Sequence, residues 1–160
     1  MVCIGFRGYI VAMFRKYASF MAGPAGVFLA DSGVFALRVW LGFSMLALHG
    51  WGKLAGYATM AGKFPDPLGV GSALSLQLAI FAEVVCAVLI VLGLASRFSS
   101  AVLAFTMAVA FFSVHGGALS GERSGELAFI YMAGYAALFL TGPGRFSVDH
   151  LILRSFGRKE

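Results

Sequence analysis

Four apolar runs of near-membrane length follow one another along the chain, separated by short segments that carry glycine, proline and charge. They cover residues 34–54, 72–94, 98–115 and 126–141. An α-helix rises about 1.5 Å per residue, so about 20 residues cross the hydrocarbon core of a bilayer. We expect the last two runs, which are slightly short, to extend into their flanks. The pattern predicts an all-α integral membrane protein, a bundle of four transmembrane helices.

The segments outside these runs complete a division into three regions. Residues 1–33 mix apolar residues with Arg7, Arg15 and Lys16, a pattern that fits either a short interfacial helix or a disordered basic tail. A signal peptide is not expected, because basic residues break the apolar stretch and no small-residue cleavage site follows it. Residues 34–142 form the expected membrane domain, and residues 143–160 a cytoplasmic C-terminal segment. Gly142-Pro143-Gly144 marks the end of the last span.

The composition supports membrane burial. The chain is 60% hydrophobic and 12% charged, with a mean hydropathy of +0.90, whereas soluble domains are roughly 45–50% apolar and 25% charged. A soluble domain of this size has too little interior for so much apolar surface. The lipid bilayer is therefore the expected partner. The net charge of +5 is attributed to topology signals and lipid headgroup contacts, and not to nucleic acid.

The basic residues predict the orientation of the bundle, because cytoplasmic loops carry an excess of lysine and arginine. The flanks and the turn after the second run hold eight basic residues, against three at the opposite ends of the runs and in the other two loops. Both termini are therefore expected in the cytoplasm. The eight are Arg7, Arg15, Lys16, Arg97, Arg145, Arg154, Arg158 and Lys159, and the three are Lys53, Lys63 and Arg123. The oligomeric state stays open, a homo-oligomer included.

Five ionisable residues in or beside the spans are candidates for a functional site. Each costs on the order of 3 kcal/mol or more in lipid unless it has a partner, a cavity or a neutral state. Placed on the predicted topology, two of them lie near the outer boundary and one near the middle of the bilayer. We expect them to line one outward-opening polar pocket. They are His49, Lys53, Glu83, His115 and Glu126.

Helical phase places each of these residues on a stripe with small neighbours, which favours a position inside the bundle. The stripes are Arg38, Gly42, Met45, His49 and Lys53; Ser72, Ser75, Ala79, Glu83 and Cys86; Ala101, Ala104, Ala108 and His115; and Glu126, Ala133 and Ala137. Trp40, Trp51, Tyr131 and Tyr135 would then point away from the stripes of their own spans. An equally weighted alternative is structural. Glu83 would pair with Lys53 or His49 to hold helices in register, while His115 and Glu126 would be interfacial.

The arginine side chains near the ends of the spans are expected outside the polar pocket. Arg38 lies near the cytoplasmic end of its span and is expected to extend to the headgroups, and Arg97 and Arg145 are expected to be structural or headgroup-facing. The spacing of cysteine, histidine and acidic residues predicts no metal site, and the sequence carries no haem, iron–sulfur or flavin signature. No cofactor is evident from the residues themselves.

Several short motifs, taken in order, resemble the DoxX family of bacterial membrane proteins. They are Arg38, Gly42, His49-Gly50-Trp51-Gly52-Lys53, Glu83, Gly93-Leu94-Ala95-Ser96-Arg97, His115 and Gly142-Pro143-Gly144-Arg145-Phe146-Ser147-Val148-Asp149. The resemblance covers about residues 34–150. It implies a four-helix protein of the bacterial inner membrane with cytoplasmic termini. Some relatives are linked to thiosulfate oxidation coupled to quinone, and others to membrane assemblies that handle oxidative and thiol stress.

Three hypotheses for function follow. In the first, the chain is a redox subunit that binds a quinone and works with a soluble oxidoreductase, and its histidines, Lys53 and carboxylates supply or relay protons. In the second, it is a non-catalytic anchor or assembly protein for partner proteins. The third, a small-molecule transporter, has less support because the sequence shows no inverted repeat or broken helix.

Overall fold

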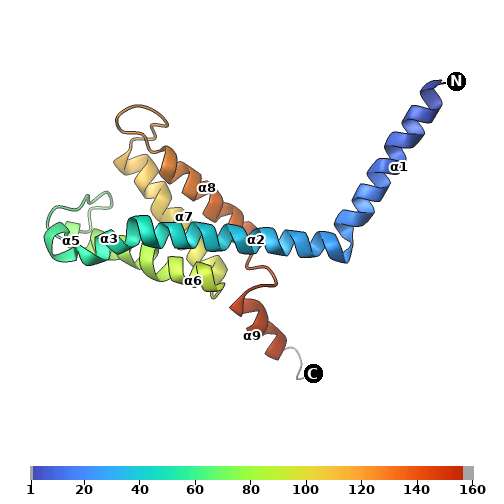
Figure 1. Ribbon diagram of the computed structural model, residues 1–160. Helices are drawn as coiled ribbons and strands as arrows, with labels where there is room; N and C mark the ends of the chain where they lie inside the picture. Colours follow the sequence, from blue (N-terminus) through green and yellow to red (C-terminus); the bar gives the residue numbers. More distant parts are fainter. Residues whose placement is uncertain (1, 157–160) are drawn as a thin grey trace. The chain divides into compact units, whose positions relative to one another are not determined.

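The computed structural model describes the backbone of residues 2–156 and the side chains of residues 9–156. Arg7, Arg158, Lys159 and Cys3 therefore lie outside the side chains that can be compared with the predictions. The chain divides into two compact units, Met1–Gly33 and Val34–Glu160. The described backbone is helical with short connections (Figure 1). Its α-helices are α1 Val2–Ala22, α2 Pro24–Met45, α3 Trp51–Ala55, α4 Tyr57–Met60, α5 Ser72–Ile80, α6 Ala87–Leu92, α7 Ser96–Val109, α8 Glu126–Thr141 and α9 Val148–Phe156.

Three π-helical turns join or extend these helices: η1 Leu46–Gly50, η2 Phe81–Cys86 and η3 Ala110–Val114. With them, α2 and α3 form one helix over Pro24–Ala55, α5 and α6 one over Ser72–Leu92, and α7 and η3 one over Ser96–Val114. Among the described residues, these three helices are long and apolar enough to cross a membrane, and α8 is a shorter apolar helix. The first of these three helices begins at Pro24, about ten residues before the apolar run 34–54 that predicted it.

Left-handed backbone conformations end two of the spans. Gly93 has a φ of 72° and Ala95 a φ of 48°, so the chain reverses within three residues between α6 and α7. The second and third spans therefore form a short antiparallel hairpin. Gly142, with a φ of 77°, ends α8 in the Gly-Pro-Gly segment as expected. The segment that follows leads into α9.

The first two spans present the predicted faces to the interior. Met45 and Cys86 are fully buried, while Trp40 is 76% exposed and Trp51 is also exposed on the opposite side. Gly42 lets α2 approach α6, because a Cβ there would lie only 2.8 Å from the Ala87 carbonyl oxygen. Small residues therefore bring these two helices together, as is common in membranes.

The interior faces of α7 and α8 differ from the prediction. In α8 the buried residues are Tyr131, Tyr135 and Leu138, whereas Ala133 and Ala137 are exposed. The tyrosine rings fill the interior, and their hydroxyl groups donate hydrogen bonds to Ser44 Oγ at 2.9 Å and to the Leu41 carbonyl oxygen at 3.0 Å. Large rings with satisfied hydroxyl groups therefore took the place expected for alanines.

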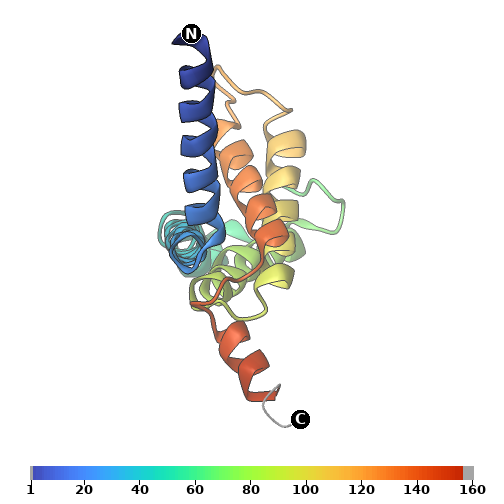
Figure 2. The ribbon, with the colours of Figure 1, turned by 90° about the vertical axis from the view of Figure 1, so that its right-hand side faces the viewer.

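In α7 the buried face carries serine and large apolar residues, and the predicted alanine stripe lies beside it. The α7 and α8 helices run alongside one another (Figures 1 and 2). Ala101 and Ala104 of α7 line a shallow groove together with Ala136 of α8, so the alanines serve the contact between these two helices. The buried residues of α7 are Ser96, Ser99, Ser100, Leu103 and Met107.

Candidate functional site

A buried ion pair joins the first and second spans. The Lys53 Nζ of α3 lies 2.5 Å from the Glu83 Oε2 of η2, and Glu83 is only 4% exposed. Gly50 makes this approach possible, because a Cβ at that position would lie 2.5 Å from the Glu83 carbonyl oxygen. The structure thus shows the pairing of Glu83 with Lys53 that was one of the two options left open.

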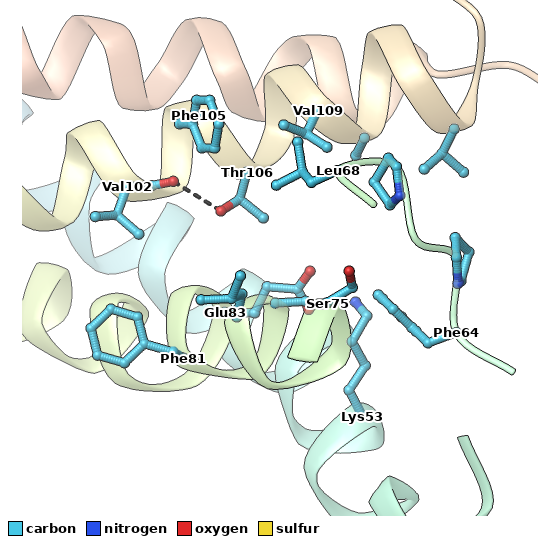
Figure 3. Close-up of a pocket in the computed structure, with 16 residues that line it drawn as sticks. Lys53, Phe64, Leu68, Ser75, Phe81, Glu83, Val102, Phe105, Thr106 and Val109 are labelled. Atoms are coloured by element: carbon cyan, nitrogen blue, oxygen red, sulfur yellow. Dashed lines mark hydrogen bonds and ion pairs between the residues drawn. The ribbon is translucent and has the colours of Figure 1, made fainter. Parts of the chain in front are cut away.

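The ion pair borders a pocket of about 500 Å³ that is otherwise almost entirely apolar (Figure 3). Three segments form its walls: α5 with η2, α7 with η3, and the loop between α4 and α5. Most of its lining side chains are aliphatic or aromatic. They include Phe64, Pro65, Pro67 and Leu68 from the loop, Leu78, Ala79 and Phe81 from α5 and η2, and Val102, Phe105, Val109, Ala110 and Val114 from α7 and η3.

Two hydroxyl groups also line the pocket, but each is already hydrogen-bonded inside the protein. Thr106 Oγ1 donates to the Val102 carbonyl oxygen at 2.9 Å, and Ser75 Oγ donates to Asp66 Oδ1 at 2.7 Å. Each hydroxyl group can still accept a hydrogen bond through its oxygen atom. Among the described residues, the charged groups that line the pocket are the Lys53 ammonium and the Glu83 carboxylate.

Asp66 fixes the loop that forms one wall. Its carboxylate accepts hydrogen bonds from the Ser75 hydroxyl and from the backbone amides of Val70 and Gly71, at 2.7, 3.0 and 2.8 Å. These donors favour the charged carboxylate and lower the pKa of Asp66 below its ordinary value of 3.8. The hydrogen bond from the Ser75 hydroxyl group makes the largest contribution. The loop is thus tied to the start of α5.

His49 lies near the ion pair but on the side of α8. It interacts electrostatically with both Glu83 and Lys53, and its ring meets the Tyr131 ring edge-on with 5.6 Å between centroids. Its Nε2 atom is buried without a hydrogen-bond partner among the described residues. His49 is not among the residues that line the pocket. His49 is therefore a neighbour of the ion pair and not part of the pocket wall.

The structure places His115 and Glu126 outside this pocket. His115 Nδ1 lies 3.2 Å from the Arg123 carbonyl oxygen, and its side chain packs against Gly125, so it holds the loop between η3 and α8. Glu126 is exposed in the first turn of α8. The similar depth of these residues in the bilayer therefore did not bring all five into one pocket. Glu126 stays outside because α8 turns its tyrosines inward, and His115 stays outside because it follows the last turn of η3.

Arg38 corrects a further expectation. It does not extend to the headgroups: it is only 1% exposed, and its Nη2 donates a hydrogen bond to the Phe146 carbonyl oxygen at 2.5 Å. The C-terminal segment folds back to provide this acceptor, and Asp149 of the same segment attracts the guanidinium charge. The Nε and Nη1 atoms are buried without a hydrogen-bond partner among the described residues. Arg97 and Arg145 have exposed side chains, and their structural or headgroup-facing role stays a prediction.

The sequence pattern did not single out the apolar pocket lining. Phe105 and Leu78 look like lipid-facing residues in the sequence, because a pocket wall and a lipid-facing surface have the same composition. The Pro65-Asp66-Pro67 segment was the one available signal, since two prolines make a loop stiff. The π-helical turns, which often mark functional sites, have no sequence signature in this chain.

The long apolar helices and the ion pair buried between them define a multi-pass helical membrane protein. The DoxX family model matches residues 33–116, just over half of the 160 residues. The chain therefore belongs to the DoxX family, as the motifs indicated. The matched region includes Lys53 and Glu83 and ends before α8. Searches of curated proteins and of solved structures found no match.

Proposed function

We propose that this DoxX protein binds a lipid-soluble quinone in the pocket beside Lys53 and Glu83, and that it is the membrane subunit of a redox pair with a soluble oxidoreductase. The observation that carries the proposal is the ion pair at the edge of an apolar pocket of about 500 Å³. Small-molecule sites typically have roughly this volume, with apolar walls and a few convergent polar groups.

The chemistry of the two charged residues suits a quinone head group. The Lys53 ammonium has three N–H donors and uses one of them on Glu83, so it can donate another to a carbonyl oxygen of the ligand. The Glu83 carboxylate can accept a hydrogen bond from a hydroxyl group of the reduced ligand. His49 interacts electrostatically with both members of the pair, and its buried Nε2 atom has no hydrogen-bond partner among the described residues.

The apolar walls suit the hydrocarbon part of such a ligand. Leu78, Phe81 and Phe105 line the pocket and are also exposed at the surface of the membrane-spanning helices. A prenyl tail would lie along these side chains and continue into the bilayer. Reduction of a quinone consumes two electrons and two protons, and the soluble oxidoreductase would supply the electrons.

A binding experiment with purified protein in lipid nanodiscs tests the proposal. A short-chain ubiquinone is titrated into protein-containing discs, and its partition into protein-free discs is subtracted. We expect saturable binding to one site. Glu83→Gln, which removes the charge, and Ala110→Leu, which fills the pocket, should each weaken binding at least about tenfold, equivalent to about 1.4 kcal/mol.

Two matched variants control for general effects. Glu126→Gln removes an exposed carboxylate and Ala133→Leu enlarges an exposed alanine of α8, both outside the pocket, so they should bind like the parent chain. Uptake that grows linearly with lipid content, or equal affinity in all five proteins, would refute quinone binding at this site.

The principal alternative is a non-catalytic anchor, and the ion pair itself gives it support. Lys53 and Glu83 satisfy each other at 2.5 Å and join α3 to η2, as a purely structural pair would. An anchor predicts that Glu83→Gln changes stability without changing any ligand affinity, and that Ala110→Leu affects neither. The titration above therefore separates the two functions.

A further inference from the structure

The C-terminal helix α9 carries an apolar face that the rest of residues 9–156 leaves exposed. Successive residues of an α-helix are turned by about 100°, so Val148, Ile152 and Phe156 form one row, with Leu151 and Leu153 on either side. The last four of these residues are exposed, from 39% for Ile152 to 70% for Phe156. His150 and Arg154 lie on the opposite face. The helix is strongly amphipathic.

Hydrogen bonds hold the first turn of α9 at the end of the bundle where α6 turns into α7. The Asp149 carboxylate accepts from the backbone amides of Ala95 and Ser96 at 2.8 and 2.9 Å, and the Asp149 amide donates to the Gly93 carbonyl oxygen at 2.9 Å. These three residues connect two membrane-spanning helices. Since α9 extends only seven residues beyond Asp149, or about 10 Å, the whole helix stays close to the membrane boundary.

The tether also sets which face of α9 is turned toward the bundle. At 100° per residue, Asp149 falls between the row that ends at Phe156 and the position of Leu153. Its carboxylate points at the first amides of α7. The apolar face is therefore on the side of the membrane-embedded helices, and Arg154 is on the other side.

Basic side chains surround this end of the bundle. Arg97, Arg145 and Arg154 all have exposed side chains here, and the sequence continues with Arg158 and Lys159. The one acidic residue of α9, Asp149, accepts hydrogen bonds from the backbone amides of Ala95 and Ser96. An apolar face combined with a basic polar face is the pattern of helices that bind anionic lipid surfaces.

We propose that α9 is an interfacial helix that lies on the bilayer at this end of the bundle, with its apolar face among the lipid acyl chains and its basic residues on anionic headgroups. The occupant of the exposed face is thus the membrane in which the protein itself is embedded. The arrangement stabilises the C-terminal segment at the position where it also provides the carbonyl partner of Arg38.

Site-specific fluorescence in nanodiscs tests this proposal. In the full-length chain, with Cys3 replaced by serine and Cys86 by alanine, single cysteines are introduced as Phe156→Cys, Leu153→Cys and Arg154→Cys and labelled with an environment-sensitive dye. The discs contain phosphatidylcholine and phosphatidylglycerol. Quenchers attached to lipid chains should dim the labels at 153 and 156 severalfold more than the label at 154, and aqueous iodide should show the reverse preference.

The other outcomes contradict the proposal. Equal iodide quenching at all three positions would show that α9 stands away from the bilayer. Shielding of positions 153 and 156 from both quenchers would show that a protein, either a partner or a second copy, covers the face. Identical quenching in discs of phosphatidylcholine alone would overturn the role of anionic headgroups.

Discussion

The two ends of the helical bundle bury charged groups in different ways. At the end that carries the loop between α4 and α5, called here the loop end, Lys53 and Glu83 pair with each other beside an open apolar pocket. At the end with the turn between α6 and α7, the turn end, Arg38 and Asp149 are bonded to backbone groups. At the loop end a charged side chain is paired with another charged side chain, whereas at the turn end charged side chains are hydrogen-bonded to backbone groups.

The partner of a buried charged side chain, whether a backbone group or another side chain, indicates its role better than the residue type does. A charge held by backbone groups of a neighbouring segment fixes that segment, and a ligand could take its place only by detaching the segment. An ion pair of two side chains beside a cavity can keep part of its contact and still offer a donor and an acceptor to a ligand. We therefore expect changes at the turn end to affect stability, and changes at the loop end to affect binding as well.

The largest expected effect is at the turn end, for Gly93→Ala. Gly93 has a φ of 72°, and a Cβ there would collide with the Arg38 guanidinium and the Ser147 Cβ. Left-handed strain and overpacking together should cost roughly 3–4 kcal/mol of the free energy of unfolding. Gly69→Ala is the matched control, because Gly69 has a φ of 69° but nothing within 4 Å, and should cost about 1 kcal/mol. Unfolding in detergent micelles measures both, and equal losses would show that Arg38 is not tightly packed.

At the loop end, Lys53→Met should cost about 2 kcal/mol, because it leaves Glu83 buried without its partner. This is below the cost for a fully buried pair, since the Lys53 side chain is 20% exposed. The double variant Lys53→Met/Glu83→Leu should recover most of the stability, as apolar replacements of buried pairs often do. It should nevertheless bind no quinone. Stability and binding that recover together would contradict the role assigned to the pair.

The smallest expected effect concerns the loop wall of the pocket and depends on pH. The pKa of Asp66 is lowered in the folded chain, so its anchoring is fully present above the ordinary value of 3.8 and is lost as the pH falls through the folded value. A dye on Leu68→Cys should therefore report loosening of the loop below about pH 4. Asp66→Asn should remove this transition. A transition that persists in Asp66→Asn would assign it to another group.

The span pattern was predictable because membrane thickness fixes helix length and lipid demands apolar side chains. The inward faces of the first two spans were predictable for a second reason. In the first span, Met45 lies on the inward face, and Trp40 and Trp51 mark the opposite face. In the second span, the ionisable Glu83 marks the inward face. The interior of α8 was not predictable from small residues, since the buried hydroxyl groups of Tyr131 and Tyr135 depend on acceptors in α2, far away in the sequence.

The candidate site was only partly predictable. Helical phase placed Lys53 and Glu83 on inward stripes, but regular phase cannot account for the π-helical turn η1, which precedes the helix that carries Lys53, or for η2, which contains Glu83. The partner of Arg38 was missed because it is a backbone carbonyl group 108 residues away. His115 lies outside the pocket because its contacts are with the loop that follows it.

The most direct test of the account is to locate a bound quinone by photo-crosslinking. An azido-quinone is irradiated with the protein in nanodiscs, and the modified peptides are identified by mass spectrometry. We expect label in the loop segment 64–68 and in α7 and η3 between residues 102 and 110, reduced severalfold by Ala110→Leu and not by Ala133→Leu. Label concentrated on the exposed face around Trp40 and Phe43, or insensitive to Ala110→Leu, would contradict it.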